Sequence, residues 1–194
     1  MRWVEHWIIG EDCLKGRRSL PYQLGCLLPD WIDRHPIHRR EESLENFLEL
    51  AVQTRSLPRG RRRDWQLGLM AHFLCDYCTE AHNEEYYNFY RHRVYEVRSQ
   101  RRIQELRRKD RKALTRVEPL PIPEMLLRAD SGDEIFREAL RRFLNENLDR
   151  LRGEVRALDC ERWYTDTRVM DLDIAWAHRL LGALLRIYRE TDGE

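Results

Sequence analysis

Imidazole and carboxylate side chains recur at fixed spacings in the first half of this sequence. His72 and Asp76 stand four residues apart, and His92 and Glu96 repeat that spacing, with His82 between the two pairs. Two residues four apart share one face of an α-helix, so each pair can offer a nitrogen and an oxygen to a single ion. Zinc accepts these ligands, and manganese or iron would accept much the same set. The spacing therefore predicts a metal site.

Three further candidate ligands lie earlier in the chain. His6 stands near its start, and Asp30 and His38 flank a short proline-containing stretch in which Asp33 and His35 are rival ligands. With the residues above, they bring the candidates to eight. One zinc ion takes only three or four protein ligands, so this number indicates two or three ions.

In this order the residues resemble the superfamily of zinc-dependent phospholipases C and S1/P1 nucleases, which are all-α phosphodiesterases with three zinc ions. An early His, an Asp in a G-x-x-x-P-D setting, a further His, H-x3-D-x5-H and H-x3-E carry the resemblance. It covers about residues 1–100. The final glutamate is more typical of the phospholipase branch, because the nuclease branch usually has aspartate there.

The resemblance implies how the ions would be shared. One zinc would be held by two carboxylates and two imidazoles: Asp30, His38, His72 and Asp76. A second would be held by His82, His92 and Glu96. A third would take His6 and the shared Asp76, with the amino group of Met1 standing where the family has that of an N-terminal Trp.

The resemblance also implies a reaction. Zinc ions close together hold a phosphodiester and activate a water molecule, and Asp30 would act as the catalytic residue that helps to deprotonate this water. Trp31 would bind the substrate, since it stands where the phospholipase branch contacts the choline head group. A Trp face binds a quaternary ammonium, but it would equally stack on a nucleobase.

We therefore expect a zinc-dependent phosphodiesterase that resembles phospholipase C and acts on a small phosphoester or a phospholipid. A nuclease or nucleotidase using the same site is the alternative within enzymes. A helical phosphohydrolase of the HD type is a more distant one, because the adjacent His-Asp pair of that type is missing. The alternative from another class is a metal-binding protein without activity.

Composition narrows the choice of partners and compartment. The 194 residues include 35 Lys+Arg and 34 Asp+Glu, so no large positive field attracts a nucleic acid. The opening residues lack the apolar stretch of a signal peptide, and no segment approaches the 18 apolar residues of a transmembrane helix. With five irregularly placed cysteines, these features favour a soluble, cytoplasmic protein.

Helices must position these side chains, because apolar residues recur at helical spacing and no strand pattern is present. We expect one all-α domain over 1–194, a multi-helix bundle with the ligand motifs in 1–100 and helical packing in 115–194. The expected helices span about 4–15, 40–55, 61–78, 84–112, 131–151 and 166–190. Gly and Pro residues indicate an irregular connection over 16–36, and Ser131 with Glu134 matches a capping box.

Several other features are expected to be structural. Cys75 and Cys78 are interpreted as small packing residues, and His178 as a core or interface histidine. The arginine-rich stretch 98–116 is interpreted as a solvated helix face, with binding to phosphate groups or an anionic lipid surface as the alternative.

Overall fold

The computed structural model describes residues 3–13, 19–32, 40–82, 88–110, 118, 120–128 and 132–190, and every regular element among them is helical. The expectation of an all-α fold is confirmed. In chain order the elements are α1 (Trp3–Cys13), α2 (Leu20–Ile32), α3 (Arg40–Arg55), α4 (Arg61–Cys78), η1 (Glu80–His82), α5 (Phe89–Lys109), α6 (Glu124–Leu127), α7 (Asp133–Ala157), η4 (Trp163–Thr165) and α8 (Thr167–Glu190). Within these ranges no helix has both the length and the apolar character needed to cross a membrane.

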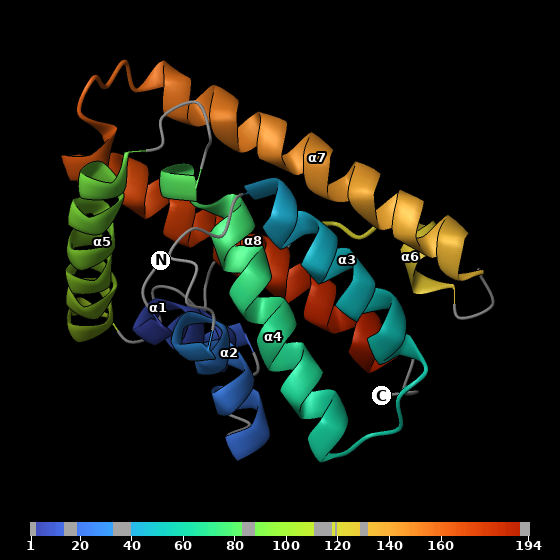
Figure 1. The fold of residues 1–194 in the computed structure, drawn as a ribbon. Helices are drawn as coiled ribbons and strands as arrows, with labels where there is room; N and C mark the ends of the chain where they lie inside the picture. Colours follow the sequence, from blue (N-terminus) through green and yellow to red (C-terminus); the bar gives the residue numbers. More distant parts are fainter. Residues whose placement is uncertain are drawn as a thin grey trace.

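Helix α4 lies at the centre of the bundle. It packs against α2 and α3, and α8 crosses behind it (Figure 1). The sequence explains this position, because the segment around Met70, Ala71 and Leu74 has no polar face and all three side chains are buried. The residues that could bind metal in α4 therefore start from the interior of the molecule.

Helix α2 corrects the expectation of an irregular connection over 16–36 for residues 20–32, and the ends of that segment lie outside the described residues. Pro21 is tolerated because it is the second helical residue, where a backbone N–H has no acceptor within the helix, and Pro29 falls near the other end. Gly25 and Gly68 lie where α2 meets α4. A Cβ on Gly68 would stand 2.2 Å from the carbonyl oxygen of Tyr22, so these glycines permit close helix packing.

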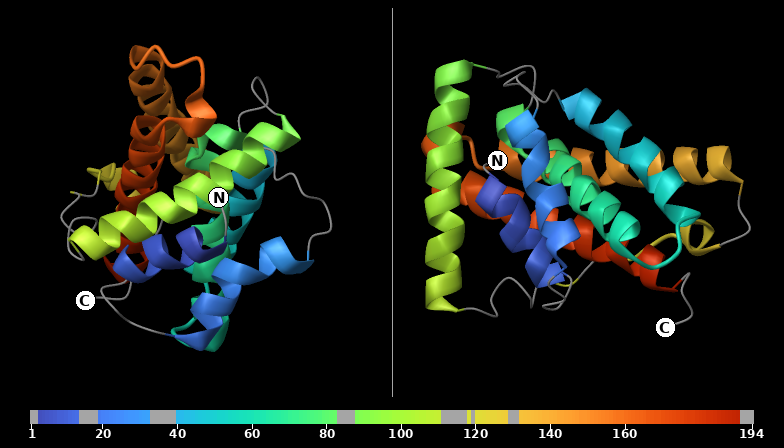
Figure 2. Two further views of the ribbon diagram at one scale, coloured as in Figure 1. Left: turned by 90° about the vertical axis from the view of Figure 1, so that its left-hand side faces the viewer. Right: turned by 60° about the horizontal axis from the view of Figure 1, so that its bottom comes forward.

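Helix α5 stands across one side of the bundle, against the end of α8 (Figure 2). It is shorter than the expected 84–112, because the side chain of Asn88 caps it by accepting hydrogen bonds from the backbone N–H groups of Tyr90 and Arg91. Basic residues fill its last turn, where they face the negative end of the helix dipole.

The C-terminal half contains two short elements that were not expected, α6 and η4, and one helix whose length differs from expectation. Helix α7 begins at Asp133, after Gly132, and continues to Ala157, six residues beyond the expected end near 151. The predicted capping box is wrong at this point, since the cap position is Gly132, which has no side chain, while Ser131 lies outside the described residues. Helix α8 matches the expected 166–190 closely.

Two apolar clusters hold the helices together. The larger one joins α1, α2, α3, α4, α7 and α8 and includes Cys75 and Cys78, which are buried free thiols, as expected. His178 is also buried, with its Nδ1 3.6 Å from the Sγ of Cys13. A smaller cluster around Tyr95 and Trp163 joins η1, α5, η4 and α8. The second cluster fixes α5 beside the end of α4.

Candidate metal centre

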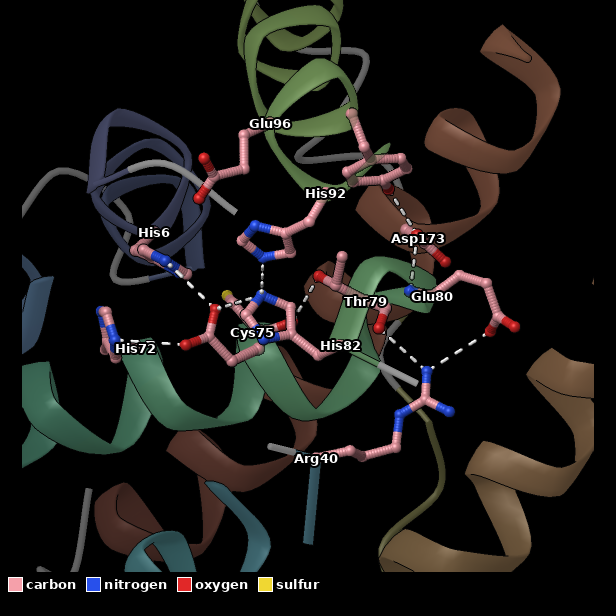
Figure 3. A network of polar contacts seen from close by, with 12 residues as sticks. His6, Arg40, His72, Cys75, Thr79, Glu80, His82, His92, Glu96 and Asp173 are labelled. Atoms are coloured by element: carbon pink, nitrogen blue, oxygen red, sulfur yellow. Dashed lines mark hydrogen bonds and ion pairs between the residues drawn. The ribbon is translucent and has the colours of Figure 1, made fainter. Parts of the chain in front are cut away.

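The carboxylate of Asp76 lies among three imidazole rings from three different elements. Its Oδ2 is 3.2 Å from Nε2 of His72, one helical turn earlier in α4. Its Oδ1 is 3.4 Å from Nε2 of His6 in α1 and 3.5 Å from Nε2 of His82 in η1. Figure 3 shows these rings converging from their separate helices. All four side chains are buried.

The chain turns after Asp76 in a way that brings His82 back to it. Thr79 ends α4, and its hydroxyl donates a hydrogen bond of 2.7 Å to the carbonyl of Cys75 while its backbone N–H donates to the carbonyl of Asp76. The backbone N–H of His82 in turn donates to the carbonyl of Thr79, which forms the single turn η1. The five-residue gap between Asp76 and His82 therefore places both on one side of the helix end.

His92 and Glu96 approach the same place from α5. The Nε2 atoms of His82 and His92 are 3.4 Å apart, and both rings are buried. Glu96 projects from α5 beside His92 (Figure 3), and its carboxylate accepts a hydrogen bond of 3.1 Å from Arg93. The pair His72 and Asp76 thus lies on α4 and the pair His92 and Glu96 on α5, and His82 contacts a member of each pair.

The orientation of His72 is set by a backbone group. Its Nδ1 lies 3.1 Å from the carbonyl oxygen of Cys26 in α2. A carbonyl oxygen only accepts hydrogen bonds, so Nδ1 carries a proton, and Nε2 is the nitrogen that faces Asp76 and is left to bind an ion. Histidines that bind metals are commonly oriented by such a second hydrogen bond.

Burial sets the charge states of these groups. It lowers the pKa of His6 well below the usual value, and that of His92 is lowered for the same reason, so both rings remain neutral at neutral pH. Burial acts to raise the pKa of Asp76, but the neighbouring imidazoles of His82 and His72 outweigh it and hold that pKa well below its usual range. The centre therefore presents an anionic Asp76 carboxylate and the neutral imidazoles of His6 and His92.

These donor atoms suit a small dication. The donor atoms that His6, His72 and Asp76 can offer all lie within 4.8 Å of one another. Nitrogen and oxygen ligands about 2.0–2.1 Å from a tetrahedral zinc ion stand about 3.3–3.4 Å apart, close to the nitrogen–oxygen distances around Asp76. Neutral imidazole with carboxylate is also a ligand set that zinc prefers.

A second group of buried polar residues, which the sequence analysis missed, holds η1 and α5 in place. Oδ2 of Asp173 in α8 accepts a hydrogen bond of 3.0 Å from the backbone N–H of Glu80 and another from the hydroxyl of Tyr95. Arg40 in α3 donates to the carbonyl of Thr79 at 2.9 Å and to the carboxylate of Glu80 at 3.3 Å (Figure 3). Burial raises the pKa of Asp173 to about 7, although the hydrogen bond from Tyr95 opposes this.

Only spatial proximity identifies this second group. Asp173 lies 97 residues after Asp76 in the sequence and carries no motif. Arg40 and Tyr95 are expected helix residues of ordinary type. Tyr95 gave a weak signal in the sequence, because it lies within the His92–Glu96 repeat. In the structure its side chain is fully buried.

The remaining predicted site residues fall where the structure describes less. Asp30 and Trp31 lie in α2, which packs on α4, but their side chains are outside the described part. His38, with its rivals Asp33 and His35, lies in 33–39, which is also outside it, and Met1 precedes the first described residue. The structure thus brings together five of the eight predicted ligands and places Glu96 beside them.

Comparison with known proteins places this arrangement in a family. The family model described as zinc dependent phospholipase C matches residues 6–157, which is more than half of the chain. The match begins at His6 and includes α4, η1 and α5, whereas Asp173 lies beyond it. No curated protein and no solved structure matches the chain.

Proposed function

This chain belongs to the zinc-dependent phospholipase C family, and from that membership we propose that it is a phosphodiesterase that uses zinc to hydrolyse a phospholipid or a small phosphoester. Membership itself implies a metal-dependent hydrolase of phosphoric esters. The observation that carries the proposal is the position of the Asp76 carboxylate, whose two oxygens face imidazole nitrogens of His6, His72 and His82 at 3.2–3.5 Å.

The family resemblance assigns the ligands, and the position of the Asp76 carboxylate is compatible with that assignment. Oδ2 of Asp76 faces His72, and Oδ1 faces His6 and His82, so one carboxylate can serve two ions. His72 and Asp76 would share the first ion with Asp30 and His38. The second ion would take His82, His92 and Glu96, and the third His6 and Asp76.

The chain's own residues prepare this centre for catalysis. Bound zinc supplies charge that neutralises a phosphate and lowers the pKa of a bound water. Burial keeps His6 and His92 neutral, so their nitrogens need lose no proton before they bind an ion. The carbonyl of Cys26 holds His72 in the tautomer whose Nε2 faces Asp76. Asp30 would accept the proton of the attacking water, and Trp31 would contact the head group of the substrate.

The test combines metal content with activity. Purified wild type should contain two or three equivalents of zinc or a similar ion, and Asp76→Asn should lose at least one, because an amide is a weaker ligand than a carboxylate. His178→Gln is the matched control, since it removes a buried histidine that lies outside the centre. Less than one equivalent in the wild type, unchanged in Asp76→Asn, would disprove the metal centre.

Activity then assigns the substrate class. Bis-p-nitrophenyl phosphate, phosphatidylcholine and single-stranded DNA are compared with wild type and Asp30→Asn. We expect turnover of the first two and a loss of about 100-fold or more in Asp30→Asn, which is the size of a typical general-base contribution. Turnover of DNA alone would favour the nuclease alternative, and a zinc-loaded protein that cleaves no ester would favour a metal-binding role without activity.

A further inference from the structure

Two large aromatic side chains lie exposed side by side at the start of α5. Phe89 is 60% exposed and Tyr90 is 71% exposed. Aromatic side chains gain free energy when they leave water, so an exposed adjacent pair is an unusual surface feature. Within the described ranges, no other two exposed large hydrophobic residues are consecutive; the rest are Leu20, Leu24, Met125 and Ile135.

Helical spacing places this pair beside the metal centre. Phe89 lies three residues before His92 and seven before Glu96, so it extends the helix face that carries these two side chains toward solvent. His92 and Glu96 are nearly buried, whereas Phe89 is not. This face of α5 thus carries the buried His92 and, one turn earlier, the exposed Phe89.

Arg93 adds a positive charge between the two aromatic residues. It lies four residues after Phe89 and three after Tyr90, which places it between them on the helix surface. Its side chain is 59% exposed, and it donates a hydrogen bond to the carboxylate of Glu96. We call these three residues, Phe89, Tyr90 and Arg93, the α5 edge.

We propose that the α5 edge docks on the surface of a phospholipid membrane and holds the metal centre against the head groups. This inference rests on the proposed function and identifies the physical form of its substrate. Aromatic side chains favour the boundary between head groups and acyl chains, and an arginine beside them is attracted to phosphate. The edge combines both kinds of group within one helical turn.

A membrane fits this position better than a protein partner does. A protein covering the α5 edge would also cover the exposed end of the helix face that carries His92 and Glu96. A membrane covering it brings phosphodiester groups to that same end, because they lie in the head-group layer. Docking and delivery of substrate are then the same event.

The experiment measures binding and hydrolysis separately. Wild type and Phe89→Ala/Tyr90→Ala are sedimented with vesicles of phosphatidylcholine containing one of two levels of phosphatidylglycerol. The same proteins are assayed on phosphatidylcholine vesicles and on soluble bis-p-nitrophenyl phosphate, and their zinc content is measured. Met125→Ala/Ile135→Ala is the matched control, because it removes two exposed hydrophobic side chains of α6 and α7.

We expect the Phe89→Ala/Tyr90→Ala variant to bind vesicles about 10-fold or more weakly, since partial burial of one aromatic side chain contributes at least that factor. Vesicle hydrolysis should fall in parallel, while zinc content and the rate on the soluble ester stay at the wild-type level. The control variant should match wild type in every measurement. Arg93→Gln, compared by sedimentation alone, should reduce the gain in binding that phosphatidylglycerol provides.

Other outcomes overturn the inference. Equal vesicle binding by wild type and the Phe89→Ala/Tyr90→Ala variant would show that the α5 edge does not dock. A loss of zinc or of soluble-ester activity in that variant would show instead that the aromatic pair supports the centre itself. If wild type cleaves neither substrate, the proposed function fails, and the sedimentation results still decide whether the edge binds membranes.

Discussion

The hydroxyl of Tyr95 in α5 donates a hydrogen bond to the carboxylate of Asp173 in α8, and the same oxygen of Asp173 accepts the backbone N–H of Glu80. One buried carboxylate therefore joins the helix that carries His92 and Glu96 to the turn that presents His82. These hydrogen bonds act together with the apolar cluster that joins η1, α5, η4 and α8. Both hold η1 in its position relative to α5.

We predict that Tyr95→Phe lowers the free energy of unfolding by about 1–2 kcal/mol, because Asp173 loses one of its two hydrogen bonds while the packing of the ring is kept. Urea unfolding monitored by circular dichroism measures the change. Tyr90→Phe is the control, since it removes the same hydroxyl from an exposed residue. Equal losses in the two variants would contradict a specific role for the Tyr95 hydroxyl.

Asp173 predicts an unusual dependence of stability on pH. Its pKa is raised to about 7 in the folded protein, while in the unfolded chain it is near 4. Between these values the unfolded chain releases the proton and the folded protein keeps it, so the stability contributed by Asp173 is complete below pH 4 and is lost as the pH rises to 7. The change is on the order of 4 kcal/mol.

Asp173→Asn removes this titration. In metal-free protein, the free energy of unfolding of the wild type should fall relative to that of Asp173→Asn as the pH rises from 4 to 8. Comparing the two proteins cancels the opposite contribution of the buried histidines, whose lowered pKa values cost stability as the pH falls. Parallel pH curves for the two proteins would mean that burial does not raise this pKa.

Replacing a glycine by alanine should have opposite effects on stability at two places, the contact between α2 and α4 and the open surface of α7. Gly68→Ala would place a Cβ 2.2 Å from the carbonyl oxygen of Tyr22, so the helices must move apart, and we expect a loss of about 2–3 kcal/mol. Gly153→Ala in α7 meets nothing within 4 Å and should stabilise the protein by about 0.5–1 kcal/mol. Thermal unfolding of both variants checks the signs, and a tolerated Gly68→Ala would argue against this packing.

Arg40 and Glu80 should behave as a pair. Arg40→Met leaves the buried Glu80 carboxylate without its guanidinium partner and should cost about 3 kcal/mol. Arg40→Met/Glu80→Gln removes the charge as well and should be less destabilised than Arg40→Met alone. Urea unfolding of the two single variants and the double variant completes the cycle, and additive losses would show that the two side chains act independently.

Local pattern was sufficient to predict most of the helices. The bounds of α3 and α4 agree with the sequence prediction because apolar spacing and flanking Gly or Pro residues act within a few residues. The prediction of an irregular connection over 16–36 was wrong at α2, because glycine within a segment usually indicates a break in a helix. Gly25 instead lets α2 touch Trp65 and Gly68 of α4. Such a contact depends on a helix more than 40 residues away, which local pattern does not contain.

The residues of the candidate metal centre likewise fall into those that local spacing predicts and those that only tertiary packing brings together. His72, Asp76 and His82 could be predicted because their spacing is a property of one helix and the turn after it, and His92 because it repeats the four-residue spacing with Glu96 on the next helix. His6 could be predicted only from the motif order, since α1 meets Asp76 through tertiary packing. Asp173 and Arg40 could not be predicted, because hydrogen bonds between distant helices leave no periodic trace in the sequence.

The hydrogen bonds of Asp173 to η1 and α5 also bear on when the candidate ligands come together during synthesis. His6 is translated first of the candidate ligands, yet the helix that carries it packs on α8. The carboxylate that holds η1 belongs to Asp173, which is translated after all of these ligands. A nascent chain that has exposed every ligand motif still lacks the last helix that positions them. The arrangement of the candidate ligands therefore depends on the folding of α8, and a chain truncated before Asp173 would retain every predicted ligand and lose the hydrogen bonds from Glu80 and Tyr95 that Asp173 accepts.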